Sequence, residues 1–147
     1  MGYGRKLNIF RHKSACVMVT RGALKAERLV YVAVVNKGLS YPHGKSKIVY
    51  IGKTKKGLAR IASSAAAKAD DLLLDFGVNS LDLFVVTCSP RQNVKTWEKL
   101  EHGLIVAFKH MFGTPPKLNK HGVGWKSDDS QPYFTENALK SAIRAYS

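Results

Sequence analysis

The sequence has few cysteines, few acidic residues and no long apolar run. Its 147 residues include only Cys16 and Cys88, too few for a disulfide framework or a four-ligand zinc site. Both lie in apolar runs, which favours small buried side chains. The longest fully apolar run, Leu29 to Val35, is too short to span a bilayer, and the basic N-terminus lacks the apolar segment of a signal peptide. We therefore expect a soluble intracellular protein, located in the cytoplasm and associated with the nucleoid if the host is bacterial.

Acidic residues are outnumbered by basic ones. The chain has 24 Lys and Arg against 10 Asp and Glu, a formal net charge of +14. Such an excess on a small domain predicts a polyanionic partner. Nucleic acid is favoured over a membrane surface, because no segment has the pattern of a basic amphipathic helix.

The hydrophobic pattern predicts one α+β domain. We expect a small, mainly antiparallel three-stranded central sheet flanked by helices, in the order β-β-α-β-α, with an extension at each end. The first two strands should form a hairpin around a loop, with Tyr50 and Gly52 on one face of the second strand. Asn93 and Thr135 are expected to cap the helices that follow them. The expected elements are strands at Leu29 to Val35, Lys47 to Ile51 and Leu81 to Cys88, a loop at Asn36 to Ser46, and helices at about Gly57 to Phe76, Val94 to Phe112 and Glu136 to Tyr146.

Three parts of the chain have different expected roles. Residues 1–28 form a basic extension, either an arm that grips phosphates or a solvated extension with an added edge strand at Ala15 to Val19. Residues 29–119 form the main domain, and residues 120–147 form a loop and helix packed on it. In that loop Trp125 either stacks on a base or, as we favour, packs over the edge of the core.

A basic corner joins the second strand to the first helix. The stretch from Tyr50 to Arg60 contains four cations, including Lys53. Backbone N–H groups at the start of a helix attract anions, and the planar fork of Arg60 matches two phosphate oxygens. Arg60 lies nearly opposite the apolar stripe of its helix, so we expect it on an open surface. The corner therefore predicts a phosphate-binding site.

Glu101 is an anomaly in its helix. It falls within the apolar stripe, one turn from Trp97 and Ile105, whereas Glu98 lies toward the polar side. A carboxylate on the core side is costly unless a cation, a metal ion or several donors meet it. The alternative is that Glu101 lies at the edge of the stripe and pairs with a lysine.

Several of these residues together resemble the GIY-YIG endonuclease domain. The resemblance covers about Leu29 to Asn119. In the first tripeptide only the tyrosine is kept, and Ser64 stands where many members have a histidine. The matching segments, in order, are Leu29-Val30-Tyr31, Tyr50-Ile51-Gly52, Arg60, Leu100-Glu101-His102-Gly103-Leu104-Ile105 and Pro116-Lys117-Leu118-Asn119.

The resemblance implies metal-dependent hydrolysis of DNA phosphodiester bonds. It implies that Tyr31, with Tyr50 beside it, orients or deprotonates the attacking water, and that Arg60 neutralises charge on the phosphoryl group. Glu101 would hold a divalent metal ion, Mg²⁺ with Mn²⁺ as the alternative, and Asn119 would fix the active-site loop or contact a phosphate. The expected partner is double-stranded or branched DNA in preference to RNA, with a homodimer on DNA as one arrangement. The expected nucleic-acid-binding residues are Lys53, Lys55, Lys56, Lys117 and Lys120.

Two other functions compete with the nuclease. One is a basic DNA- or RNA-binding module of the same fold whose nuclease residues are idle. The other is an RNA binder of the ribosomal type, which accounts for the net charge of +14 but gives no reason for Glu101 within an apolar stripe. Metal-dependent strand cleavage separates the nuclease from both.

Overall fold

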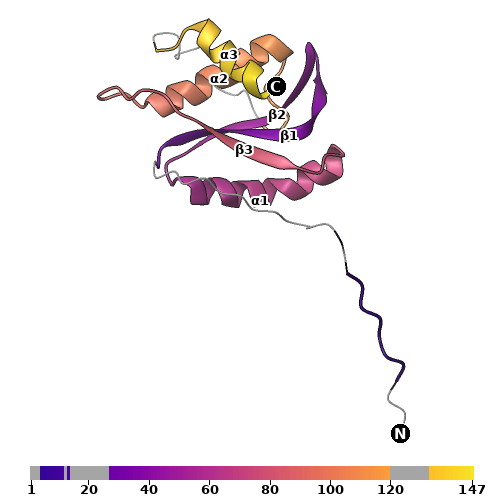
Figure 1. Ribbon diagram of the computed structural model, residues 1–147. Helices are drawn as coiled ribbons and strands as arrows, with labels where there is room; N and C mark the ends of the chain where they lie inside the picture. Colours follow the sequence, from indigo (N-terminus) through magenta and orange to yellow (C-terminus); the bar gives the residue numbers. More distant parts are fainter. Residues whose placement is uncertain (1–3, 12, 14–26, 120–132) are drawn as a thin grey trace.

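A three-stranded antiparallel sheet in the order β2-β1-β3 forms the middle of the molecule (Figure 1). The computed structural model describes residues 4–11, 13, 27–119 and 133–147. The α+β class and the antiparallel sheet with flanking helices are as the sequence predicts. The elements are β1 (Leu29–Tyr41), β2 (Gly44–Thr54), α1 (Leu58–Asp75), β3 (Leu81–Val86), α2 (Thr96–Phe112) and α3 (Glu136–Tyr146).

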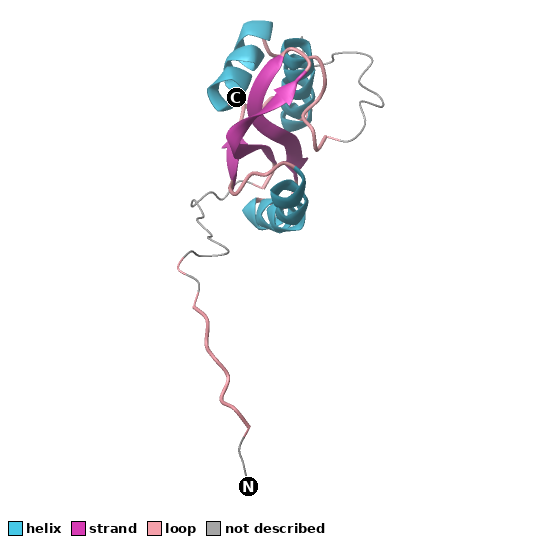
Figure 2. Cartoon of the chain, turned by 90° about the vertical axis from the view of Figure 1, so that its right-hand side faces the viewer, coloured by secondary structure: helices cyan, strands magenta, loops and turns pink. Residues whose placement is uncertain are grey.

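Helices cover both faces of the sheet. α1 lies on one face, and α2 and α3 lie together on the other (Figures 1 and 2). Side chains of β1 alternate between the two: Val30 and Val32 join the larger core with α2 and α3, while Leu29 and Tyr31 pack with Ile61 of α1. This two-sided burial explains why the first half of β1 is a continuous apolar run.

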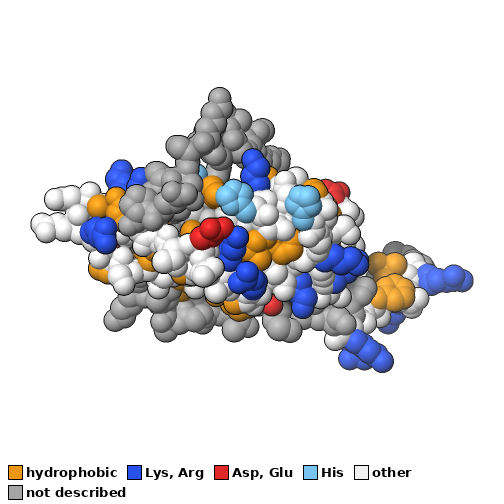
Figure 3. All heavy atoms as spheres, turned by 90° about the horizontal axis from the view of Figure 1, so that it is seen from above, with side chains coloured by type: hydrophobic (Ala, Val, Ile, Leu, Met, Phe, Trp, Pro, Cys, Tyr) orange, Lys and Arg blue, Asp and Glu red, His pale blue; other side chains and the backbone are white. Residues whose placement is uncertain are grey.

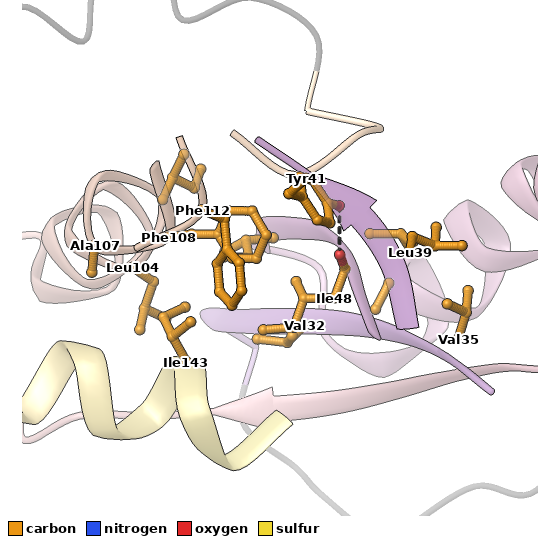
Figure 4. Close-up of a cluster of buried hydrophobic side chains, with 14 of the residues drawn as sticks. Val32, Val35, Leu39, Tyr41, Ile48, Leu104, Ala107, Phe108, Phe112 and Ile143 are labelled. Atoms are coloured by element: carbon orange, nitrogen blue, oxygen red, sulfur yellow. Dashed lines mark hydrogen bonds between the residues drawn. The ribbon is translucent and has the colours of Figure 1, made fainter. Parts of the chain in front are cut away.

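The hairpin between β1 and β2 is longer than predicted. The expected loop at Asn36 to Ser46 is wrong, because the strands continue to a two-residue turn at Pro42 and His43. Packing outweighs the local glycine and proline signals. The Tyr41 hydroxyl donates to the Ile48 carbonyl oxygen at 2.8 Å, and the Tyr41 ring packs against aromatic side chains of α2 (Figure 4). The pairing of β1 with β2 shifts register between Val34 and Leu39, so the strands continue past the irregular residues between them.

The hairpin tip docks on the end of α2. The His43 N–H donates to the Phe112 carbonyl oxygen at 3.1 Å. Gly113, which ends α2, has φ 91°, and an added Cβ there would lie 2.7 Å from His43 Cδ2 and 2.9 Å from Pro42 Cβ. The absence of a side chain at Gly113 therefore lets the tip lie against the helix end.

Two smaller sequence predictions also need correction. Asn93 does not cap α2: its φ is 60°, and the helix begins after Lys95 without a side-chain cap. β3 ends at Val86 rather than Cys88. The prediction for α3 is confirmed, because the Thr135 hydroxyl oxygen accepts from the Ala138 N–H at 3.1 Å.

α3 completes the core on the α2 face. Its buried side chains, Leu139 and Ile143, belong to the larger core cluster. No helix in the described ranges is long and apolar enough to cross a membrane. Cys88 is half-buried rather than buried. The segment Ala15 to Val19, Cys16, Lys120 and Trp125 lie outside the described residues.

Candidate functional site

Two tyrosines lie over a glycine on the α1 face of the sheet. Tyr31 of β1 pairs with Gly52 of β2, and Tyr50 precedes Gly52 by two residues on the same face. The ring centroids are 5.8 Å apart. A Cβ on Gly52 would lie 2.5 Å from Tyr50 Cε1 and 2.8 Å from the Tyr31 hydroxyl oxygen. The tyrosine pair therefore requires glycine at position 52.

The environment keeps Tyr50 protonated at neutral pH. Burial, followed by the charge and the hydrogen bond of Tyr31 and the charge of Glu101, raises the pKa of Tyr50 to about 12. Glu101 of α2 lies close enough for its charge to act on Tyr50.

Lys68 of α1 completes the tyrosine cluster, and the sequence analysis missed it. Its Nζ lies 3.4 Å from the centroid of the Tyr50 ring. Burial, and then the charge of Arg60, lowers the pKa of Lys68. Arg60, Ser64 and Lys68 follow one another at four-residue spacing, so they share a face of the helix. That spacing, counted onward from Arg60, is the signal that would have found Lys68.

The basic corner between β2 and α1 is exposed. Arg60 is on the surface, as its position opposite the apolar stripe predicts, and Lys55 and Lys56 are exposed beside it in the sequence. The turn is held locally, because the Lys56 N–H donates to the Thr54 hydroxyl at 3.0 Å. Gly57, with φ 72°, leads into α1. These cations are open to a large anionic partner.

Two carboxylates of α2 meet one ammonium group of β2. Lys53 Nζ lies 3.5 Å from Glu98 Oε1 and 3.8 Å from Glu101 Oε1. The Glu101 side chain is only 17% exposed, against 33% for Glu98. Burial raises the pKa of Glu101, Lys53 opposes this, and Glu98 adds to it. Glu98 is the more exposed of the two, as its position toward the polar side of the helix predicts, and both carboxylates face Lys53.

The carboxylate pair has the donor chemistry of a hard divalent cation. Within the described ranges, no group of three or more His, Cys, Asp or Glu side chains is arranged to hold a metal ion. Glu98 and Glu101 nevertheless approach one point, and burial of Glu101 favours a cation there. Mg²⁺ takes oxygen ligands and commonly uses one or two carboxylates with water. The residues present therefore fit Mg²⁺ or a similar ion.

Asn119 is attached to the edge of the sheet beside this site. Its side-chain oxygen accepts from the Ile51 N–H at 2.9 Å, and its Nδ2 donates to the Ile51 carbonyl oxygen at 2.8 Å. Ile51 lies between Tyr50 and Gly52. Both hydrogen-bonding groups of the Asn119 amide are thus engaged in fixing the strand that carries the tyrosine and the glycine.

Lys117 lies away from Arg60. Its backbone N–H donates to the Tyr41 hydroxyl at 3.1 Å, and its Nζ lies 5.8 Å from the Phe76 ring centroid. Phe76 follows the last turn of α1, whereas Arg60 is in the first turn. At 1.5 Å per residue the two positions are about 24 Å apart along the helix. Lys117 and Arg60 are therefore at opposite ends of α1.

Lysine and arginine side chains are spread over the face formed by α2 and α3, with few acidic side chains among them (Figure 3). With the exposed corner at Lys55, Lys56 and Arg60, basic residues reach beyond a single patch. A net charge of +14 distributed in this way suits an extended anionic polymer better than a small anion.

Comparison of the chain with protein-family models, with curated proteins and with solved structures finds no match. The arguments for function therefore come from the site itself: a tyrosine pair on one face of an antiparallel sheet, a lysine over one ring, and a carboxylate pair at the sheet edge.

Proposed function

We propose that this protein is a metal-dependent endonuclease of the GIY-YIG type that hydrolyses DNA phosphodiester bonds. The observation that carries the proposal is the convergence of Tyr31, Tyr50 and Glu101. The rings of Tyr31 and Tyr50 lie together on the α1 face, and Glu101, on the helix that covers the other face, is near enough for its charge to raise the pKa of Tyr50. The exposed cations at Lys55, Lys56 and Arg60 add a surface for the phosphate backbone.

The tyrosine pair would act on the attacking water. Tyr31 would orient the water or accept its proton, with the protonated Tyr50 beside it. The Lys68 ammonium over the Tyr50 ring holds that ring in place and adds positive charge beside the tyrosine pair. Arg60 would bind the phosphoryl oxygens and stabilise the charge that develops on them.

Glu101 and Glu98 would hold the divalent ion, Mg²⁺ or Mn²⁺. When bound, the ion supplies Lewis-acid stabilisation of the leaving oxygen. Lys53, which faces both carboxylates, would be released from them to contact a phosphate. Asn119 holds the β2 backbone at Ile51, and so keeps Tyr50 and Gly52 in position.

Cleavage of supercoiled plasmid tests the proposal. The protein is incubated at low salt with Mg²⁺, Mn²⁺ or EDTA, beside Glu101→Ala and the control Glu136→Ala, which removes an exposed carboxylate on α3. We expect metal-dependent nicked or linear product from the wild type and the control, and none from Glu101→Ala, which should still shift DNA in a gel. Equal cutting by Glu101→Ala would exclude Glu101 as the metal ligand.

The second candidate is a nucleic-acid-binding module without catalysis. The ion pairs of Lys53 with both carboxylates favour it, because an ammonium group already meets the charge that a metal ion would neutralise. This module would bind DNA or RNA with the same exposed cations. A gel shift without cleavage under any of the metal conditions, on plasmid and on branched DNA, would support it over the nuclease.

A further inference from the structure

A cavity of about 230 Å³ lies beside the candidate site, at the start of α2. Its walls come from the beginning of β1, the end of β3 with the residues that follow it, and the first turns of α2. Trp97 and Leu100 line it, and their sequence neighbours Glu98 and Glu101 carry the carboxylate pair. Val30, also in the wall, pairs with Lys53 across the sheet. The cavity is therefore next to the carboxylates, on the α2 face.

The cavity combines cations with an apolar wall. Among the described residues that line it there are two arginines, Arg28 and Arg91, and no carboxylate. Arg28 Cζ lies 4.8 Å from the centroid of the Trp97 ring, and Arg91 Cζ lies 5.2 Å from that of Tyr133. Each guanidinium rests on an aromatic ring and keeps its N–H groups for an acceptor.

One polar group in the wall lacks a partner. The Trp97 Nε1 atom is buried and has no hydrogen-bond acceptor among the described residues. Because this N–H is itself closed off, Trp97 offers the cavity the apolar surface of its ring. The lining thus offers the positive charge of two arginines and an apolar, partly aromatic surface to a single ligand.

We infer that this cavity receives one unpaired nucleotide of the DNA substrate, with its phosphate on Arg28 and Arg91 and its base against Trp97 and the apolar wall. The inference rests on the proposed function for the choice of DNA. A base stacked in a duplex cannot enter a recess of this size, whereas a bulged, flap or overhanging nucleotide can. The preferred substrate is therefore DNA with an unpaired nucleotide near the scissile bond.

Binding in EDTA tests the inference without requiring cleavage. Fluorescence anisotropy compares a hairpin duplex, the same duplex with a one-nucleotide bulge, and that duplex with an abasic bulge. We expect the bulged duplex to bind about tenfold more tightly than the intact duplex. The abasic bulge should lose most of this gain, because the base is missing.

Two variants connect any preference to the cavity. Cys88→Trp fills it from the wall, and Arg91→Ala removes an exposed cation with little risk to the fold. Both should reduce the bulge preference at least severalfold and leave duplex binding nearly unchanged, while Arg144→Ala, on the surface of α3, should change neither. Equal affinity for bulged and intact duplex would overturn the inference. So would a preference that survives Arg91→Ala and a folded Cys88→Trp.

Failure of the inference is distinguishable from failure of the proposed function. Metal-dependent cleavage without bulge preference would support the proposed nuclease function and exclude the cavity as a nucleotide-binding site. Bulge preference that depends on Arg91, in a protein that cuts no DNA, would support the nucleotide site in a binding module.

Discussion

Gly52 decides the geometry of the tyrosine pair at the scale of single residues. A Cβ at this position would collide with ring atoms of both Tyr31 and Tyr50. We predict that Gly52→Ala displaces the rings, lowers stability by about 1–3 kcal/mol and reduces DNA cleavage more than DNA binding. Urea unfolding and plasmid nicking measure the two effects. Gly38→Ala is the matched control, since the nearest atom to a Cβ there, Lys45 Cβ, is 3.4 Å away.

Full nicking activity in Gly52→Ala, beside an unchanged Gly38→Ala, would contradict a role for the tyrosine pair in the chemistry.

Glu101 links stability to pH. Because burial raises its pKa, the folded protein holds the Glu101 proton more tightly than the unfolded chain does. The resulting stability is fully present below the unfolded pKa and is lost as the pH rises through the folded pKa. We predict that Glu101→Gln, in EDTA, melts at a higher temperature than wild type at neutral pH, and that the difference disappears below about pH 4.

Thermal unfolding across this pH range measures the effect. Glu136→Gln is the control of opposite sign, because the hydrogen bond and charge of Lys140 lower the pKa of that exposed carboxylate. A lower melting temperature for Glu101→Gln at neutral pH would mean that the ion pair with Lys53 outweighs the cost of burial.

At the scale of elements, Gly113 joins the hairpin to α2. Its φ of 91° disfavours a side chain, and a Cβ there would also press on Pro42 and His43. We predict that Gly113→Ala costs about 1–3 kcal/mol and loosens the hairpin tip. Gly77→Ala separates backbone strain from the steric contact of the new Cβ. Gly77 also has a positive φ, 61°, but the atom near a Cβ there is Lys37 Nζ, the end of a flexible side chain, at 3.6 Å. Urea unfolding gives the free energies, and equal losses would assign the whole cost to backbone strain.

The sequence predicted the elements better than their ends. The hydrophobic runs and helical stripes identify the described strands and helices. Where one or both faces of an element are buried, apolar residues recur along the sequence with the spacing of a strand or a helix. The sequence predicted a loop at Asn36 to Ser46, where the structure has the end of the hairpin. This segment contains turn-forming residues, and its extended conformation depends on contacts with α2. Asn93 was misjudged because a favourable capping residue does not fix where the first helical turn begins.

The candidate site was predictable only in part for a similar reason. The residues that a motif marks, such as Tyr31 and Glu101, could be selected from the sequence. Lys68 and the shared contact of Glu98 with Lys53 depend on which strand faces which helix. That information belongs to the tertiary packing, and a single helical stripe does not carry it.

At the scale of the whole molecule, the charge excess should dominate DNA binding. With a net charge of +14, affinity should fall steeply with salt, because each neutralised phosphate releases counterions. We predict that Lys55→Ala weakens binding for all sequences alike and reduces the slope of log K against log salt by about 1. Anisotropy titrations at several salt concentrations measure the slope.

Lys140→Ala is the control for that measurement, since Lys140 is paired with Glu136 on α3. A slope unchanged by Lys55→Ala would exclude the β2–α1 corner from the DNA contact.

The attachment of Asn119 also has a consequence for self-association. β2 is an edge strand, and such an edge is a template on which another copy of the chain can add a strand. The Leu118 N–H donates to the Val49 carbonyl oxygen at 2.9 Å. The Asn119 amide accepts from the Ile51 N–H and donates to the Ile51 carbonyl oxygen. Residues 118 and 119 thus occupy backbone groups of β2 that could otherwise pair with a strand of another molecule. Removing the Asn119 amide should therefore make the protein prone to aggregate.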